Sequence, residues 1–382
     1  MGSKKRIAQC LTAIAGAFLL AIAGYTVHAL EAAPPAPPRA AAQAANGVPV
    51  APAPGLGPGE CSKTGRPPAG FYIPQRSKTP WCWDVVAMDD AVPTKAYATP
   101  KKARKILVLC KAAGFVHSSI PLAAATVKEL GDRTGAWSTT ITYDPADINA
   151  QNLQQYDLVF LASTTGQFLD DPNNKELTTE RRQALLNFVR SGKGLAGVHA
   201  AVDSYHTSPS MSGFRRGDPA QRRAAMAAAE SFVPTGTWPD YNKMIGGFFK
   251  WHWPYPQVIT VKIDDKKSPL TQMFHGQEFV IHDETYTMAQ DSYSLKNVHE
   301  LTSIDYSKMS QADKDKEPAA SRRTDGDYGL SWIRREGKGR VFIEVLGHDE
   351  HMYEMPVYLE HLLAGIQYAL GDLRANDAPT ER

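Results

Sequence analysis

The stretch that decides the fold is Lys105-Ile-Leu-Val-Leu-Cys110, a continuous apolar run typical of a strand buried on both faces of a parallel sheet. The sequence predicts a helix directly after it. Ser118 or Ser119 can cap that helix, Pro121 fits its first turn, and apolar residues recur at helical spacing. A buried strand followed at once by an amphipathic helix is the repeating unit of a parallel α/β sheet.

The same alternation continues along the chain. Strands are predicted over residues 137–143, 157–163 and 194–201, with a helix between the last two that Thr178 caps and Gly192 ends. This spacing indicates an α/β fold with a doubly wound, mostly parallel sheet.

After residue 201 the pattern changes toward an added antiparallel region. Residues 208–239 suggest a long insertion or lid with a helical patch at 220–231. Strands are predicted over 258–263 and 277–288, and Glu336-Gly337-Lys338-Gly339 predicts a hairpin between strands 330–335 and 340–346. Residues 307–327 are expected to form a solvated loop. A last helix over 356–370 should pack Leu359, Leu362, Leu363 and Ile366 inward.

The N-terminal segment predicts export. Lys4-Lys5-Arg6 precedes an apolar run over residues 7–27, so residues 1–29 are expected to be a signal peptide or an uncleaved membrane anchor. Residues 30–60 form an Ala/Pro-rich linker, residues 61–100 an irregular lead-in, and residues 101–382 the main domain. The expected location is the periplasm or the extracytoplasmic face of the membrane, with attachment through residues 7–27 in the anchor alternative.

Composition restricts the partners and the redox chemistry. Lys and Arg total 42 against 40 Asp and Glu, so no charge excess points to nucleic acid. An exported chain meets an oxidising compartment, which makes Cys61 and Cys82 candidates for a disulfide, whereas Cys110 ends an apolar strand and should be buried and inert. There is no Gly-x-Ser-x-Gly elbow, no phosphate-binding loop and no cysteine after residue 110, which disfavours nucleophilic serine or cysteine catalysis.

Polar side chains recur where strands should end. Five short segments, at residues 113–117, 197–201, 246–252, 282–286 and 347–351, each carry a histidine or a carboxylate. Because the carboxyl ends of the strands form the ligand crevice of an open α/β sheet, these groups are expected to gather there. For a lone His199 the alternative is a core histidine with a backbone hydrogen bond, and for a lone His117 a capping or surface histidine.

The expected position of these residues at strand ends allows a metal site, although the sequence has no tight motif such as His-Glu-x-x-His. Strand alternation would place His282, Glu284 and Tyr286 on one face and Asp283 on the other. Histidines at strand ends, with His117, His199 and His348 as the candidate ligands, could hold a divalent metal such as zinc together with a carboxylate. Acid/base chemistry without an ion is equally permitted. Trp251 and Trp253, which flank His252, could stack on sugar rings or simply pack.

Several motifs together resemble the ThuA-like (trehalose utilisation) family over residues 105–370. They are Lys111-Ala-Ala-Gly-Phe-Val-His117, Ser163-Thr-Thr-Gly166, the run from Gly192 to Asp203, Ile245-Gly-Gly-Phe248, and Gly339-Arg-Val-Phe342 through Gly347-His348. The resemblance implies a flavodoxin-like fold related to class I glutamine amidotransferases, with His199 near the position of the amidotransferase cysteine. The residues between Asp203 and Ile245 form a longer connection than is usual in the family.

The resemblance also implies a function in carbohydrate metabolism, in particular the handling of oxidised (3-keto) disaccharides or glycosides. The residues expected in the site are His117, His199, Asp203, His252, Glu284 and His348. We expect His199, Glu284 and Asp203 to be catalytic, with Glu284 or His199 as the base, and His117, His252, Trp251 and Tyr286 to bind substrate. His117 and His348 would polarise a carbonyl directly or through a metal. The hypothesis is a glycoside hydrolase or lyase; the alternative is a non-catalytic sugar-binding or accessory subunit of a membrane-associated complex. A homo-oligomer is also left open.

Overall fold

A computed structural model describes residues 78–209 and 219–381. Its main element is a nine-stranded sheet with strand order β2-β1-β3-β4-β11-β10-β9-β6-β7. The strands are β1 (Lys105–Leu109), β2 (Ser138–Thr142), β3 (Leu158–Ala162), β4 (Gly194–Val198), β6 (Gln257–Ile263), β7 (Phe279–Asp283), β9 (His299–Ile304), β10 (Gly329–Glu336) and β11 (Gly339–Glu344). A separate two-stranded sheet pairs β5 (Phe249–His252) with β8 (Tyr286–Met288).

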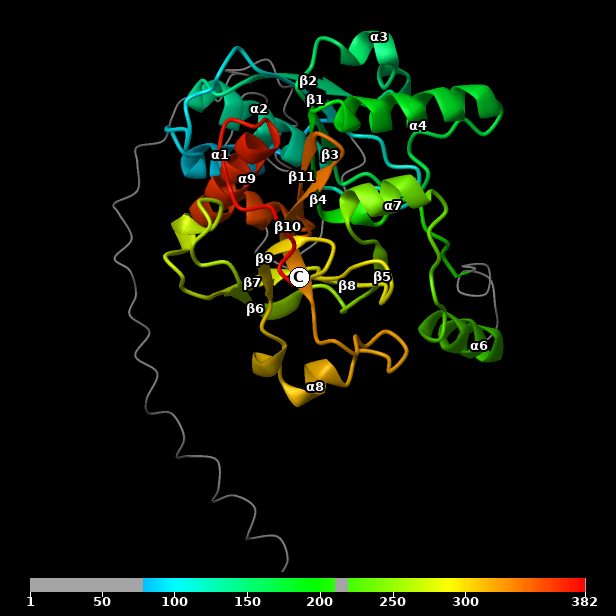
Figure 1. The fold of residues 1–382 in the computed structure, drawn as a ribbon. Helices are drawn as coiled ribbons and strands as arrows, with labels where there is room; N and C mark the ends of the chain where they lie inside the picture. Colours follow the sequence, from blue (N-terminus) through cyan, green and yellow to red (C-terminus); the bar gives the residue numbers. More distant parts are fainter. Residues whose placement is uncertain (1–77, 210–218, 382) are drawn as a thin grey trace, which may run out of the picture. The chain divides into compact units, whose positions relative to one another are not determined.

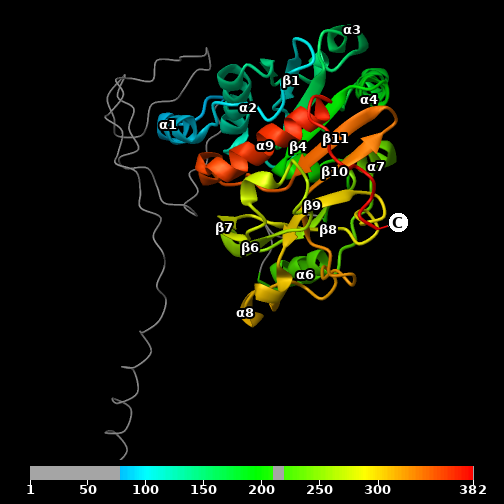
Figure 2. The same cartoon turned by 60° about the vertical axis from the view of Figure 1, so that its left-hand side comes forward.

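Helices cover both faces of the large sheet, as a doubly wound fold requires (Figure 1; Figure 2). One hydrophobic core joins the sheet to α2 (Ile120–Thr134) and α9 (Pro356–Ala369), and a second joins the opposite face to α4 (Lys175–Arg190) and α7 (Pro239–Ile245). Shorter helices are α1 (Cys82–Ala91), α3 (Ala150–Leu153) and α8 (Gln311–Lys314). The predicted doubly wound α/β fold is therefore confirmed.

The sheet is parallel in one half and antiparallel in the other. Strands β2, β1, β3, β4 and β11 pair with one another in parallel. Strands β10, β9, β6 and β7 continue the sheet with antiparallel pairing. The predicted hairpin is present, but its second strand, β11, also pairs in parallel with β4, so the antiparallel region extends the parallel sheet directly.

Three local predictions are wrong. The strand expected to reach residue 201 ends at Val198, and a 3-10 turn over His199–Val202 follows. Helix α4 begins one turn earlier than expected, because Asn174 caps it by accepting from the backbone N–H groups of residues 176 and 177, while Thr178 lies inside the first turn. The strand predicted over residues 277–288 is two strands, β7 and β8, which belong to different sheets.

The segment over residues 307–327 is only partly the solvated loop that its charge suggests. Glu317 is 2% exposed and accepts hydrogen bonds from the hydroxyls of Thr287 (3.0 Å), Tyr306 (3.1 Å) and Tyr328 (3.0 Å). Arg323, 5% exposed, donates to backbone carbonyls at residues 288, 289 and 293. Buried charge is tolerated here because each of these side chains has several hydrogen-bond partners, and the segment thereby fixes strand β8.

The remaining predictions concern the insertion and the N-terminus. Helix α6 (Pro219–Glu230) lies within the predicted insertion and stands away from the sheet in Figure 1. Cys82 is disulfide-bonded and Cys110 is a buried free thiol, whereas the predicted partner Cys61 and the apolar segment 7–27 lie outside the described residues. Among residues 78–209 and 219–381, no helix combines the length and the apolar character needed to cross a membrane.

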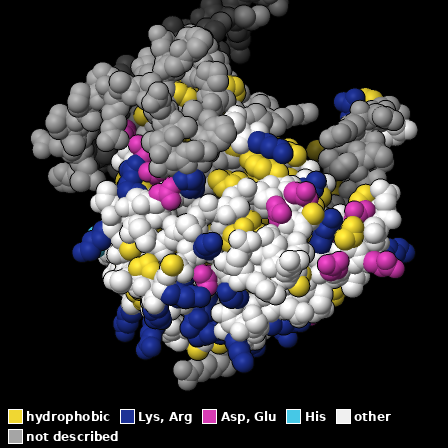
Figure 3. Space-filling model, turned by 90° about the horizontal axis from the view of Figure 1, so that it is seen from above, with side chains coloured by type: hydrophobic (Ala, Val, Ile, Leu, Met, Phe, Trp, Pro, Cys, Tyr) yellow, Lys and Arg dark blue, Asp and Glu magenta, His cyan; other side chains and the backbone are white. Residues whose placement is uncertain are grey.

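The face in Figure 3 carries both acidic and basic side chains, as the near-balanced composition predicts.

Candidate functional site

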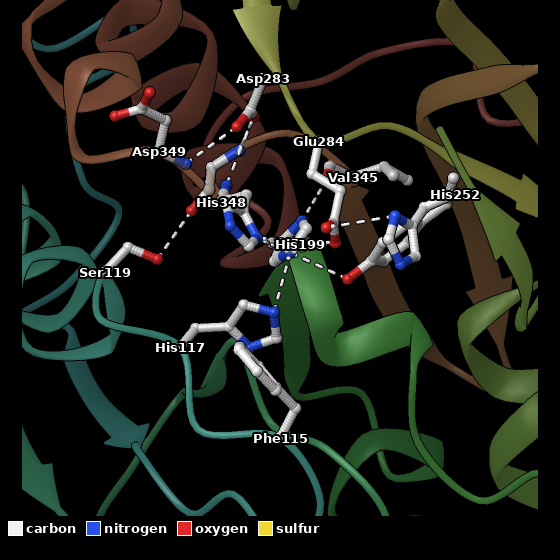
Figure 4. A network of polar contacts seen from close by, with 12 residues as sticks. Phe115, His117, Ser119, His199, His252, Asp283, Glu284, Val345, His348 and Asp349 are labelled. Atoms are coloured by element: carbon white, nitrogen blue, oxygen red, sulfur yellow. Dashed lines mark hydrogen bonds and ion pairs between the residues drawn. The ribbon is translucent and has the colours of Figure 1, made fainter. Parts of the chain in front are cut away.

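Four polar side chains from distant parts of the chain meet at the carboxyl edge of the parallel strands. His117 lies in the loop after β1, His199 directly follows β4, Glu284 links β7 to β8, and His348 follows β11. One ligand-type atom from each lies within 4.8 Å of the others, and all four residues are buried (Figure 4). Their exposed fractions are 3%, 0%, 8% and 6%, in the order just given.

His199 is the centre of the cluster. Its Nδ1 lies 3.0 Å from the carbonyl oxygen of Val345, and because a carbonyl only accepts, Nδ1 must carry the proton and Nε2 the lone pair. That Nε2 lies 3.2 Å from Nε2 of His117 and 3.2 Å from Nδ1 of His348, while the hydroxyl of Tyr286 donates to it at 2.8 Å. The single lone pair on Nε2 of His199 cannot accept hydrogen bonds from His117, His348 and Tyr286 at once. A cation between the three imidazole rings would instead bind the lone pairs of all three facing nitrogens.

Burial keeps these rings neutral. Desolvation lowers the pKa of His117 and of His199 well below the usual value, and mutual repulsion between the rings acts in the same direction. Desolvation also lowers the pKa of His348, although the neighbouring Glu284 opposes this. Neutral imidazole is the form that binds metals, so the cluster has the protonation state that a metal site needs.

Glu284 brings a carboxylate to the same point. Its Oε1 lies 3.6 Å from Nε2 of His199 and 3.5 Å from Nδ1 of His348, and its Oε2 lies 3.3 Å from Nδ1 of His252. The side chain of His252 is 44% exposed, so Glu284 lies between the buried histidines and a histidine that solvent reaches. Three histidine nitrogens and one carboxylate form a ligand set that could hold a divalent metal ion.

Backbone features hold the ligands in place. His199 has φ of 46°, in the left-handed region that a bulky L-residue rarely adopts, and Ser163 at the end of the adjacent β3 has φ of 47°. Such conformations typically cost about 1–3 kcal/mol and collect at functional sites. In His199 this conformation follows from the break between β4 and the 3-10 turn, which turns the side chain toward the other ligands (Figure 4).

Asp283 connects Glu284 to the His348 loop. Its Oδ2 accepts from the backbone N–H of Gly347 (2.7 Å) and of His348 (3.3 Å), and its Oδ1 accepts from that of Asp349 (2.8 Å). Burial raises the pKa of Asp283, and the N–H groups of Gly347 and Asp349 oppose that rise. Both oxygens accept N–H bonds, a geometry that suits the ionised carboxylate, because a proton on either oxygen would meet an N–H group.

The other predicted site residues are distributed differently. Tyr286 joins the cluster through His199, and His252 joins it through Glu284. Asp203 instead pairs with His206, whose Nε2 lies 2.7 Å from Asp203 Oδ1, and this pairing raises the pKa of His206 against the effect of its burial. Trp251 is half-buried, and its ring contacts that of Trp253 at 5.0 Å, both packed into the sheet core.

The expected alternation around Glu284 is wrong, and it hides a residue of the site. His282 is exposed while residues 283–286 are all buried, because the chain leaves β7 at Asp283 and enters another sheet at Tyr286. Sequence reasoning therefore placed Asp283 away from the site, although it supports the His348 loop. It also missed Tyr255, whose ring lies 4.6 Å from that of His348 and whose hydroxyl donates to Asp349 at 2.5 Å. The acidic pair Asp283-Glu284 at a strand end was the sequence signal that could have pointed to Asp283 as a residue of the site.

Fold and site together define a flavodoxin-like α/β protein with a buried three-histidine, one-carboxylate cluster. The chain belongs to the ThuA family, described as trehalose utilisation, whose model matches residues 105–232 and 224–369. This confirms the family resemblance of the sequence.

Comparison with solved structures gives distant likenesses. A ThuA-like protein from Bacteroides uniformis is 20% identical, with 71% of this chain and 94% of that chain covered and a TM-score of 0.49. A ThuA-like protein from Parabacteroides merdae is 18% identical, with 73% and 96% covered and a TM-score of 0.44. A β-galactosidase from Bacillus circulans is 8% identical, with 76% and 34% covered and a TM-score of 0.37. No curated protein matches the chain.

Proposed function

We propose that this protein is an exported, metal-dependent enzyme that acts on a keto-sugar or an oxidised glycoside. The observation that carries the proposal is the convergence of neutral nitrogens from His117, His199 and His348 beside the carboxylate of Glu284. The family description, trehalose utilisation, supports a carbohydrate as the substrate.

In the proposed site the three histidines would hold a divalent cation such as zinc. A bound divalent cation supplies Lewis acidity, which polarises a carbonyl oxygen and makes the neighbouring C–H bond more acidic. Val345 keeps the lone pair of His199 facing inward through its hydrogen bond to Nδ1. The hydroxyl of Tyr286, 2.8 Å from His199 Nε2, can donate to a substrate oxygen bound at the same point.

Glu284 is the proposed base. It takes the proton from the carbon beside the ketone, the electron pair of that C–H bond forms a C=C bond, and the bond to the glycosidic oxygen breaks. The carboxyl of Glu284 then returns its proton to the leaving oxygen, so the products are an enone and an alcohol, and later addition of water would make the net reaction a hydrolysis. The exposed His252, 3.3 Å from Glu284 Oε2, would orient that carboxylate and contact the substrate.

Asp203 remains a predicted catalytic residue through the family resemblance, and Trp251 a predicted substrate contact. Export, with cleavage or anchoring of residues 1–29, rests on the basic and apolar N-terminal sequence. Intact-mass measurement of the native protein tests it, because retention of residues 1–29 and the Cys61–Cys82 bond both change the mass.

The decisive experiment measures metal and turnover in the same samples. Purified wild-type chain should contain about one divalent metal per chain and convert a 3-keto glycoside, with loss of the metal in His117→Ala and His348→Ala. Glu284→Gln should abolish enone formation, followed by ultraviolet absorbance. His282→Ala is the matched control, since this exposed histidine lies two residues from Glu284 and outside the cluster. Unchanged metal content in both histidine variants would overturn the metal assignment. Sugar binding without turnover would favour the accessory-subunit alternative.

A further inference from the structure

The side of the cluster that solvent reaches carries a half-buried aromatic ring, that of Phe249. Its centroid lies 4.8 Å from that of Tyr286 and 5.9 Å from that of His252, and both of these residues contact the cluster directly. The side chain of His252 is 44% exposed, and Figure 4 shows it on the side of Glu284 away from His117. An accessible surface therefore begins at Glu284 with His252 and continues to Phe249.

A break in strand pairing turns Phe249 toward this surface. The pairing of β5 with β8 has a register shift between Phe249 and Trp251. In a regular strand Phe249 and Trp251 would share one face, with His252 on the other. The irregularity instead brings the rings of Phe249 and His252 together, while Trp251 contacts Trp253. Bulges of this kind often redirect a side chain beside a functional site.

An ion pair lies beyond Phe249 on the same surface. The ring of His206 is 5.8 Å from that of Phe249, and its Nε2 lies 2.7 Å from Asp203 Oδ1. The Nδ1 of His206 lies 2.9 Å from the carbonyl oxygen of Thr207. An ionised carboxylate and a carbonyl only accept hydrogen bonds, so both ring nitrogens carry protons and His206 is an imidazolium ion.

This ion pair leaves the second carboxylate oxygen of Asp203 available to a ligand. Within residues 78–209 and 219–381, no group forms a hydrogen bond or ion pair with its Oδ2, and the Asp203 side chain is 25% exposed. The side chain of His206, which holds Oδ1, is only 4% exposed. A ligand on this surface would therefore meet a carboxylate oxygen whose position is already fixed.

We propose that Phe249, Asp203 and His206 form a binding subsite for a hydroxyl-bearing sugar ring on the exposed side of the cluster. This assignment rests on the proposed function and deepens it. The C–H face of the ring would pack on Phe249, and its hydroxyls would donate to Oδ2 of Asp203, because a sugar ring is apolar on its faces and polar at its edge. His206 is a positioning residue, and Asp203 acts in binding in place of the catalytic role that the family resemblance implies.

Titration of the zinc-loaded full chain with trehalose measures the subsite, because trehalose has no ketone and is bound without turnover. Asp203→Asn and Phe249→Ala should each raise the Kd by about tenfold, through loss of the acceptor's charge and of the ring contact. His206→Ala should weaken binding similarly, and His206→Gln should restore it in part, because the glutamine amide can still donate to Asp203. With a 3-keto glycoside, Asp203→Asn should raise KM and leave kcat nearly unchanged.

The chain offers a matched control for each kind of variant. Nε2 of His299 lies 2.9 Å from Asp265 Oδ2 and its Nδ1 lies 2.7 Å from a backbone carbonyl oxygen, and the Asp265 side chain is 23% exposed. This pair therefore repeats the bonding of His206 and Asp203. Phe279 is a half-buried phenylalanine of strand β7. Both controls lie near the ends of β6 and β7 away from Glu284, so Asp265→Asn and Phe279→Ala should leave the Kd of trehalose unchanged.

Four outcomes would overturn the subsite: no trehalose binding by the wild type, an unchanged Kd in Asp203→Asn and Phe249→Ala, an equal rise of the Kd in the control variants, or a fall in kcat at constant KM in Asp203→Asn. The last result would place the carboxylate in the chemical step. A wild-type chain that holds no metal and converts no keto glycoside, yet binds trehalose in a manner that Asp203→Asn weakens, would refute the proposed chemistry and support the subsite. The two failures are thus distinguishable.

Discussion

Replacement of Asp283 by asparagine tests how the structure positions its metal-ligating loop. Asp283 contacts neither substrate nor metal in the proposed site; it acts by accepting the backbone N–H groups of Gly347, His348 and Asp349. Asparagine has the same shape, but only one of its two terminal atoms accepts hydrogen bonds. The variant therefore places an amide N–H against a buried backbone N–H on one side.

The size of the effect follows from the bonds lost. If the amide oxygen of the variant takes the position of Oδ2, the bond to Asp349 is lost; if it takes the position of Oδ1, the bonds to Gly347 and His348 are lost. Hydrogen bonds to charged groups contribute about 1.5–3 kcal/mol each, and the amide should adopt the orientation that loses only the bond to Asp349, so we expect the free energy of unfolding to fall by about 1.5–3 kcal/mol. Outer-sphere changes of this kind typically weaken metal binding by about 10–100-fold, and we expect that range for Asp283→Asn.

Urea unfolding of the metal-free chain and cobalt titration of the folded chain measure the two effects separately. Asp372→Asn is the matched control: this buried carboxylate also accepts through both oxygens, from the backbone N–H of Lys101 at Oδ1 (3.0 Å) and from Nε of Arg104 at Oδ2 (2.9 Å), and it lies beyond helix α9 in a segment that carries no candidate ligand. It should destabilise the fold and leave cobalt affinity unchanged. Unaltered cobalt affinity in Asp283→Asn, despite a comparable loss of stability, would refute the positioning role.

Three further predictions concern the fold around the site. Burial lowers the pKa of His361 from 6.5 to about 4, so as the pH falls the unfolded chain binds a proton before the folded chain does. The free energy of unfolding should therefore fall by about 3 kcal/mol between pH 6.5 and pH 4. In His361→Gln the midpoint of urea unfolding should change less over this pH range. Burial raises the pKa of Glu300 to about 8, so the stability that its protonated carboxyl contributes is present at low pH and is lost as the pH rises from about 4.5 to 8. If the urea midpoint of Glu300→Gln declined over this range as steeply as that of the wild type, the prediction would be contradicted. A Cβ on Gly365 would lie 2.3 Å from Phe342, so Gly365→Ala should lower the thermal midpoint through about 1–3 kcal/mol of overpacking while cobalt affinity stays the same.

Much of the fold could be predicted from local sequence because the relevant signals are local. The apolar run at Lys105 and the helix after it need no distant partner to be recognised, and both are present, although the Ser119 hydroxyl donates to the carbonyl of Gly347 and does not cap the helix. The hairpin around Gly337 follows from turn chemistry in the same way. Errors arise where tertiary contacts decide, as in the charged 307–327 segment that Glu317 and Arg323 anchor in the interior.

The site shows the same division. Its histidines could be predicted as a group, because strand ends of a parallel sheet share an edge, and His117, His199 and His348 do meet there. Alternation failed at Glu284 because that residue lies between two sheets, and a residue period of two holds only within one strand. The role of Asp283 in holding the His348 loop therefore had no local signal in the sequence, apart from its position in the acidic pair Asp283-Glu284.

The sequence by itself determined the family, the alternation of strands and helices in the parallel half of the sheet, and which residue types could carry the chemistry. Only the tertiary structure decided that the nitrogens of three histidines face one another, that Glu284 and not Asp203 joins them, and that Trp253 is core. The physical reason is that periodicity and turn residues report on neighbours along the chain. The approach of side chains 82 to 149 residues apart, as in the contacts of His199 with His117 and His348, depends on how whole strands pack.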